Sequence, residues 1–398
     1  MNKESEDSAN IMRDNKLEIA GISVFTNKPV KLSISSGRII NIEDIKDTYQ
    51  KQDKLPYLAP GLVDLQINGY SGVDFNTLPL SSDQVVKATR EILRKGVTTF
   101  FPTVITNSDS SIEKLVSIIN EARHKDQLTA DAIQGIHLEG PFISRDVGAR
   151  GAHDIQYIRE PDWDSFVRWQ KASGDLIKII TISPEWDNSN EFIEKCRSNG
   201  VTVSIGHTIA KKEKIDQAVL WGAAMSTHLG NGAPAMIPRH PNFIWEQLAA
   251  DELHTCMIAD GFHLPDSVIQ VFMRAKRDKI MLVSDAVYLS GEKPGNYHTH
   301  IGGDVTLTDN GKLYLTNTPK LLAGSVQMLP DAIGNLIRKN LTTLKEAWEM
   351  GSKRPGEFMG MHNIVDLMIG SWADIVTFNR IDDRIEFIDV YKHGRKVN

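Results

Sequence analysis

Eight short apolar runs dominate the chain between residues 62 and 285, and most of them are followed by an amphipathic stretch of helix length. Buried parallel strands have near-continuous apolar sequences, and a strand followed by a helix implies a right-handed crossover to the next parallel strand. Eight such units suit a closed (β/α)8 TIM-type barrel of roughly 250 residues. The expected strands are 62–67, 98–105, 132–139, 176–183, 201–206, 224–228, 255–260 and 280–285.

The segments between these strands differ in character. The segment after His228 is rich in Pro and Gly and is expected to be an extended loop. Residues 288–318 form an insertion, in which Asp309-Asn310-Gly311 lies between two alternating segments and predicts a hairpin of 304–308 with 312–316. Helices are expected at 83–95, 110–124, 163–172, 191–198, 211–221, 265–276, 326–338 and 343–350.

Both ends of the chain show strand-like alternation. Residues 17–24, 30–34 and 38–42 are separated by turn-forming sequences, and alternation returns at 373–378 and 384–390. We expect the two ends to join in a small β-sandwich domain. The predicted organisation is a polar, disordered tail at 1–15, a β domain of 16–60 plus 360–398, and a barrel of 61–359.

Composition restricts the class of protein. The net charge is −6 and the chain carries no long basic run, which argues against nucleic acid as the main partner. No segment reaches the roughly 18 apolar residues of a membrane span. Cys196 and Cys256 are too few for a disulfide framework and are typical of buried thiols in a reducing compartment. We therefore expect a cytoplasmic protein that does not bind a membrane.

Polar residues close several of the predicted strands. Glu139 ends the third strand, His207 follows the fifth, His228 ends the sixth and Asp285 ends the eighth. The carboxyl ends of barrel strands share one rim, which is where such barrels carry catalysis. A carboxylate with two imidazoles suits one divalent ion with an open position for water. Zn²⁺ is the expected ion, and Fe²⁺, Co²⁺ and Mn²⁺ are compatible with the same ligands.

Asp285 completes a hydrolytic site in this interpretation. A divalent metal lowers the pKa of its bound water from about 15.7 to about 7. Asp285 would be ionised at neutral pH, so it could accept the water's proton and pass it to a departing amine. The sequence therefore predicts metal-assisted hydrolysis of an amide or a related bond.

Six motifs extend this argument to a family. They resemble the amidohydrolase superfamily, and specifically its branch of N-acetylglucosamine-6-phosphate deacetylases. The resemblance runs from about residue 60 to 374, and His137-Leu138-Glu139-Gly140-Pro141-Phe142 is its most specific part. The other motifs are Gly61-Leu62-Val63-Asp64, Gly206-His207-Thr208, Thr227-His228-Leu229, Asp260-Gly261-Phe262-His263 and Ser284-Asp285-Ala286.

The resemblance implies roles for further residues. Many superfamily members hold a second metal with His-x-His on the first strand, where this chain has Gln66 and Asn68. One main metal is therefore implied, with Asp285 as general acid/base. Arg239 is implied to contact a phosphate in the partner subunit of a homodimer. The implied sugar contacts are Ala152, His153, Asn231, Gly232, His263 and the loop of Leu322, Ala323, Gly324 and Ser325.

Three functions stay open at this point. The leading hypothesis is hydrolysis of the acetamide of an N-acetylated amino sugar 6-phosphate, giving acetate and the amino sugar phosphate. The second is the same chemistry on another N-acyl amine or a cyclic amide, because Gly230 to Pro234 departs from the family pattern. The third is an inactive scaffold barrel, which the presence of all four metal and acid/base residues disfavours. Gln66 could contact substrate or fill the second-metal position.

Overall fold

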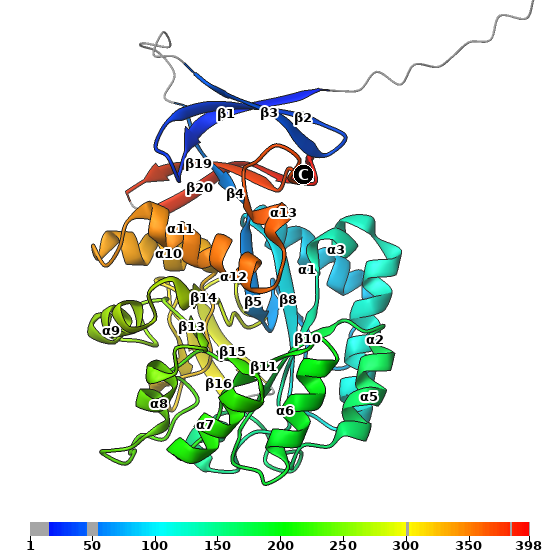
Figure 1. The fold of residues 1–398 in the computed structure, drawn as a ribbon, viewed down its shortest axis with the longest axis vertical. Helices are drawn as coiled ribbons and strands as arrows, with labels where there is room; N and C mark the ends of the chain where they lie inside the picture. Colours follow the sequence, from blue (N-terminus) through cyan, green and yellow to red (C-terminus); the bar gives the residue numbers. More distant parts are fainter. Residues whose placement is uncertain (1–15, 46–54, 300–301, 383, 398) are drawn as a thin grey trace, which may run out of the picture.

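The computed structural model describes residues 16–45, 55–299, 302–382 and 384–397, and its centre is a parallel β-barrel (Figure 1). Neighbouring strands pair in parallel along the sheet. Asp285 N donates to Gln66 O at 2.9 Å and Ile67 bridges Ala286, so the ends of the sheet meet. The predicted barrel is confirmed. Its strands, in order, are β5 (Leu62–Ile67), β8 (Val97–Ile105), β9 (Ile136–Glu139), β10 (Ile177–Ile182), β11 (Thr202–Ile205), β12 (Ala223–Ser226), β13 (His254–Met257) and β14 (Ile280–Leu282).

Helices surround the barrel and bury one apolar face each against it (Figure 1). Their starts follow local chemistry: Ser81 and Gln84 form a capping box, and the Asp162 side chain accepts from Asp164 N. The outer helices are α1 (Ser82–Arg94), α2 (Asp109–Lys125), α5 (Trp163–Ala172), α6 (Ser189–Ser198), α7 (Lys212–Trp221), α8 (Phe243–Ala249), α9 (Asp266–Lys276) with the 3-10 turn η1 (Arg277–Lys279), α10 (Leu329–Arg338) and α11 (Leu344–Gly351).

Several expected boundaries differ from the observed ones by a few residues, and two expectations were wrong for a clear local reason. The strand expected from 132 begins only at Ile136, because residues before it form α3 (Gln127–Ala132), which Asp126 caps. The segment after His228 is not a loop throughout, since Asn242 caps α8 by accepting from Ile244 N and Trp245 N. A further turn, α4 (Val147–Arg150), begins at Asp146. Short helices carry too little periodicity to be recognised, although their capping residues were visible.

Apolar side chains fill the part of the barrel interior next to its amino end, and this end is closed. α12 (Lys353–Phe358) and α13 (His362–Val365) lie between the barrel and the sheet of the chain ends (Figure 1). Ile364 and Val365 of α13 pack into the same cluster as the inward-facing strand residues. The carboxyl ends of the strands therefore open at the opposite rim. The inward-facing residues are Val63, Leu65, Phe101, Ile179, Met225, Cys256, Ile258, Met281 and Val283.

Both chain ends contribute to one seven-stranded sheet that folds into two layers, with β1–β3 above β19 and β20 (Figure 1). Ile19, Leu58 and Ile375 belong to the core between the layers. The predicted sandwich is confirmed. The expected tail at 1–15 lies outside the described residues, and the boundaries at 60/61 and 359/360 stay a prediction. The strands are β21 (Arg395–Lys396), β20 (Arg384–Lys392), β19 (Ile375–Ile381), β4 (Tyr57–Pro60), β1 (Leu17–Ser23), β2 (Pro29–Ser35) and β3 (Arg38–Asp44).

The insertion after Asp285 forms a separate four-stranded antiparallel sheet. The predicted hairpin is present, with Val305 opposite Leu315. The chain then returns to the rim, where Ser325 bridges Ala286 in parallel. The strands are β15 (Gly295–Thr299), β16 (Gly303–Leu307), β17 (Leu313–Leu315) and β18 (Thr318–Leu322), and a small hairpin of β6 (Gly69–Tyr70) and β7 (Val73–Asp74) follows β5.

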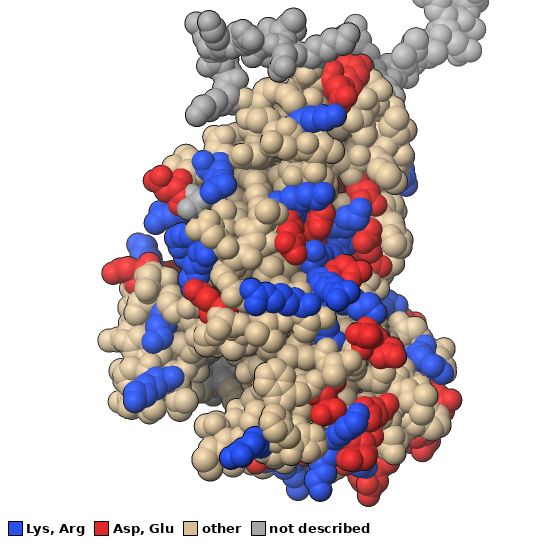
Figure 2. Space-filling view, turned by 60° about the vertical axis from the view of Figure 1, so that its left-hand side comes forward, with Lys and Arg blue, Asp and Glu red and all other residues tan. Residues whose placement is uncertain are grey.

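The surface shows no segregation of charge on the face drawn in Figure 2, where Lys and Arg lie among Asp and Glu. This mixture agrees with the small net charge of −6. Among the helices that the structure describes, none is both long and apolar enough to cross a bilayer.

Candidate metal centre and active site

The candidate site is built where barrel strands end at the carboxyl rim. Glu139 is the last residue of β9, while His207, His228 and Asp285 follow β11, β12 and β14. The last three have positive φ angles of 48°, 25° and 48°. Residues other than Gly rarely adopt a positive φ angle. Each such residue costs on the order of 1–3 kcal/mol of folding free energy. Strain after three strands of the same rim favours a functional site there.

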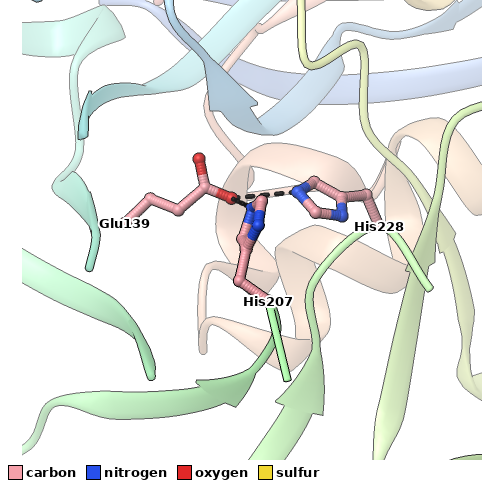
Figure 3. A group of neighbouring side chains, drawn as sticks. All are labelled: Glu139, His207 and His228. Atoms are coloured by element: carbon pink, nitrogen blue, oxygen red, sulfur yellow. Dashed lines mark hydrogen bonds and ion pairs between the residues drawn. The ribbon is translucent and has the colours of Figure 1, made fainter. Parts of the chain in front are cut away.

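Three of these residues meet closely (Figure 3). Glu139 Oε1 lies 2.9 Å from His228 Nε2 and 3.1 Å from His207 Nε2. The side chains of all three are at most 8% exposed. One ligand atom from each lies within 4.8 Å of the other two, so the group could hold a metal ion. The structure therefore brings together the three metal ligands expected from the sequence.

The surroundings of the three side chains fit a metal ion. His207 Nδ1 is hydrogen-bonded to Ala149 O at 2.8 Å, which directs Nε2 to Glu139, and metal-binding histidines commonly have such a partner. Gly232 packs against the same ring, where an added Cβ would lie 2.6 Å from His207 Nδ1. His228 Nδ1 is buried with no hydrogen-bond partner among the described residues. One carboxylate and two imidazoles form a donor set that suits Zn²⁺ and neighbouring transition metals.

The charges of Glu139, His207 and His228 depend on one another. Burial opposes ionisation of Glu139, but the hydrogen bonds from His207 and His228 outweigh it and hold the pKa of Glu139 well below its usual value. Burial likewise opposes a charge on His228, yet Glu139 raises the pKa of His228 to about 9. A metal ion would take the place of these protons, because only neutral imidazole nitrogens are ligands.

Asp285 stands beside the triad and not within it. Asn68 Nδ2 donates to Asp285 Oδ1 at 2.7 Å. Burial raises the pKa of Asp285 to about 6, and the opposing charge of His228 only partly offsets this. A buried carboxylate with a raised pKa is suited to accept and then release a proton near neutral pH.

Gln66 contacts Glu139 directly. Its Nε2 donates to Glu139 Oε1 at 2.9 Å, and its side chain is buried. Asp64, two residues earlier, accepts from Gln66 N and Ser284 N at 3.2 Å each. Burial raises the pKa of Asp64 to about 7. Asp64 therefore stabilises the contact between the first and last strands of the barrel, whereas the side chain of Gln66 points to the triad.

Two of the expected substrate-binding histidines lie at the site. His153 Nε2 is 3.9 Å from Glu139 Oε2, and its Nδ1 is hydrogen-bonded to Thr106 Oγ1 at 2.7 Å. Burial and the charge of His207 lower the pKa of His153 to about 3, so it is neutral. His263 Nδ1 is paired with Asp260 Oδ2 at 2.7 Å. Each ring thus has one nitrogen held and the other available to a ligand.

The remaining expected contacts are spread along the rim. Asn231 is half-buried and bonds back to His228 O, whereas Ala152 is exposed next to His153. Leu322, Ala323 and Gly324 precede Ser325, whose carbonyl accepts from Val287 N, so this loop runs beside Asp285. Arg239 lies in the exposed segment 235–241. The structure therefore gathers most of these residues, but not Arg239, around one triad.

Several supporting residues were not expected from the sequence. Asp260, Thr106 and Ala149 each fix the orientation of a site histidine. The only available signal was the Asp260-Gly261 turn, because Ala149 acts through its backbone and Thr106 through tertiary proximity. A series of buried side-chain hydrogen bonds also lies beneath the triad. It joins His137 Nε2 to Thr181 Oγ1 at 2.7 Å and Thr181 Oγ1 to Thr227 Oγ1 at 2.6 Å.

Comparison with known proteins agrees with this geometry. The model of the amidohydrolase family matches residues 57–397. The chain belongs to the amidohydrolase family. As a family member it is a hydrolase, and the family's metal dependence agrees with the triad of Glu139, His207 and His228.

Individual relatives share most of the chain. The N-acetylglucosamine-6-phosphate deacetylases of Caenorhabditis elegans and Homo sapiens are each 32% identical, over 356 and 354 residues, covering 85% of this chain and 82% and 83% of theirs. The crystal structure of N-acetylglucosamine-6-phosphate deacetylase from Pasteurella multocida is 25% identical with a TM-score of 0.82, covering 96% of this chain and 99% of that chain. This amidohydrolase therefore matches deacetylases across nearly its whole length.

Proposed function

We propose that this amidohydrolase removes the acetyl group of N-acetylglucosamine 6-phosphate, giving acetate and the amino sugar phosphate. The observation that carries the proposal is the buried Glu139, His207 and His228 triad with Asp285 beside it. Relatives that bear this activity in their names match 85% of the chain. The chain carries all four of these side chains, which argues against an inactive scaffold.

The chain would hold one divalent metal ion, with Zn²⁺ favoured, through Glu139, His207 and His228. When bound, such an ion supplies Lewis acidity, which activates water at neutral pH and polarises a carbonyl. Asp285 accepts a proton from the attacking water and returns it to the nitrogen as the C–N bond breaks. Each turnover consumes one water and releases acetate and the amine, so the carboxylate of Asp285 is regenerated.

The histidines at the rim would orient the sugar. His153 is neutral and fixed by Thr106, so its Nε2 can hydrogen-bond the acetamide oxygen if it carries the proton. His263, held by Asp260, would contact a hydroxyl or the phosphate. Asn231, Gly232 and the loop of 322–324 would line the remaining wall.

A homodimer would complete the phosphate site. Arg239 is exposed, and its side chain has no ion pair with any residue that the structure describes. Apolar side chains surround it in sequence: Met236 is 88% exposed and Trp245 is 48% exposed. Burying such residues against a second copy would be favourable and would carry Arg239 toward the partner's site. Both cysteines are buried free thiols, which suits the cytoplasm that we propose as its location.

Acetate release from a panel of substrates tests the proposed function. We expect turnover of N-acetylglucosamine 6-phosphate that is lost with chelator and restored by Zn²⁺. Turnover of the unphosphorylated sugar should be much slower, and Arg239→Ala should impair only the phosphorylated substrate. Arg277→Ala, at the end of α9, is the matched control for losing a surface arginine. Full activity after complete metal removal would exclude the proposal, and equal rates on both sugars would exclude the phosphate role.

A further inference from the structure

Two carboxamides at the end of β5 each contact a different acid of the site. Gln66 Nε2 donates to Glu139 Oε1 at 2.9 Å, and Asn68 Nδ2 donates to Asp285 Oδ1 at 2.7 Å. The two residues are separated by Ile67, which faces the apolar core. One strand end therefore reaches both the proposed metal ligand and the proposed proton carrier.

The direction of each amide follows from its partner. An ionised carboxylate only accepts hydrogen bonds, so the nitrogen of each amide must face it. Hydrogen bonds to charged acceptors are stronger than neutral ones, and they hold the carboxylate in a defined rotamer. An amide adds no charge and does not titrate, so it restrains two neighbouring acids without competing for protons. With Nδ2 committed to Asp285, Asn68 Oδ1 is buried and has no partner among the described residues.

We propose that Gln66 and Asn68 are positioning residues with separate tasks. Gln66 sets the carboxylate of Glu139 for metal binding, whereas Asn68 sets the carboxylate of Asp285 for proton transfer. The unpartnered Asn68 Oδ1 then accepts a hydrogen bond from the reacting water, which aligns that water with Asp285. The part concerning Asn68 rests on the proposed function, whereas the part concerning Gln66 concerns metal binding alone.

Because the proposed tasks of Gln66 and Asn68 differ, nearly isosteric variants of the two residues should show different defects. Gln66→Met should weaken Zn²⁺ affinity about 10–100-fold, the usual loss when an outer partner of a metal ligand is removed. Saturating Zn²⁺ should restore most of its kcat. Asn68→Leu should keep Zn²⁺ affinity within about threefold of the parent protein and lower kcat about 10–100-fold with little change in KM. Zn²⁺ affinity is measured by competition with a chromophoric chelator, and kcat and KM by acetate release.

A control variant separates these tasks from loss of stability. Asn188 Nδ2 donates to Pro161 O at 2.7 Å, in a contact between loops that includes none of the site residues. Asn188→Leu should lower thermal stability and leave Zn²⁺ affinity and kcat unchanged. If either isosteric variant fails to fold, Gln66→Ala or Asn68→Ala replaces it with the same expectation.

Two results would overturn the inference. One is equal loss of Zn²⁺ affinity in the Gln66 and Asn68 variants, and the other is parental Zn²⁺ affinity in Gln66→Met together with parental kcat in Asn68→Leu. Absence of acetate release by the parent protein on every substrate would instead contradict the proposed function. In that case the Zn²⁺ measurement on Gln66→Met would still decide the role of Gln66.

Discussion

The two ends of the barrel both bury charged side chains, but they do so in opposite ways. At the amino end Lys392 Nζ contacts Asp374 Oδ2 at 2.5 Å and Thr99 Oγ1 at 3.1 Å, and His393 N donates to Asp374 Oδ1. The side chains of Lys392 and Asp374 are fully buried. One cation faces one anion there, and both oxygens of the anion have partners.

The carboxyl end lacks this balance. Glu139 and Asp285 are both acids, and their nearest buried partners are imidazoles and amides. His228 Nδ1 and Asn68 Oδ1 have no partner among the described residues, and three backbone positions are strained. A satisfied buried pair specifies structure, whereas unsatisfied groups on strained backbone indicate a place for a ligand. The comparison assigns stability to the amino end and chemistry to the carboxyl end.

The largest expected effect is at the carboxyl end. Asp285→Asn removes the proton acceptor, so acetate release should fall about 10²–10⁴-fold while bound metal is retained. Burial raises the pKa of Asp285 to about 6. Above that pH the carboxyl group is ionised in the folded protein, and its buried charge lowers the free energy of unfolding. The metal-free variant should therefore unfold at a higher temperature than the metal-free parent at pH 7.5. A variant that is active or less stable would contradict this assignment.

Removing a buried charge at the amino end should lower the stability of the protein, whereas removing that of Asp285 should raise it. Lys392→Met leaves Asp374 buried without its cation and should cost about 3–5 kcal/mol in the free energy of unfolding. The double variant Lys392→Met with Asp374→Leu should recover part of that loss. The kcat of folded protein should be unchanged in both variants. Chemical denaturation measures the first effect, and a selective loss of kcat without loss of stability would break the comparison.

Much of the fold could be predicted because its strands are long or buried on both faces. All eight barrel strands, the paired ends and the hairpin around Asn310 carried direct sequence signals. The short helices α3, α4 and α8 did not, since one or two turns show little periodicity. For this reason the start of the strand that ends at Glu139 was expected at residue 132, four residues before its observed start at Ile136.

The residues of the candidate metal site were likewise visible in the sequence, because each closes a strand at the same rim. The residues that orient them could not be found the same way. Thr106, Asp260 and the Ala149 carbonyl reach their histidines only through tertiary contacts. The direction in which Gln66 and Asn68 point also depends on how Glu139 and Asp285 are placed by other strands.

A smaller effect is expected in the pH dependence of activity. Asp285 must be ionised to accept a proton, and burial raises its pKa to about 6. A bound divalent cation favours the ionised form and lowers that pKa. The value of kcat/KM should therefore be constant above about pH 6 and fall about tenfold per unit below its acid limb. An acid limb above pH 7 would show that another group limits the reaction.

The central claim is that the carboxyl end holds one catalytic metal ion in the site of Glu139, His207 and His228. Titrating the metal-free protein with Zn²⁺ while measuring acetate release from N-acetylglucosamine 6-phosphate tests it most directly. We predict activity that rises linearly and saturates at one equivalent per chain, and no response in Glu139→Gln at the same Zn²⁺ concentrations. Activity without metal, or saturation only at two equivalents, would contradict the account.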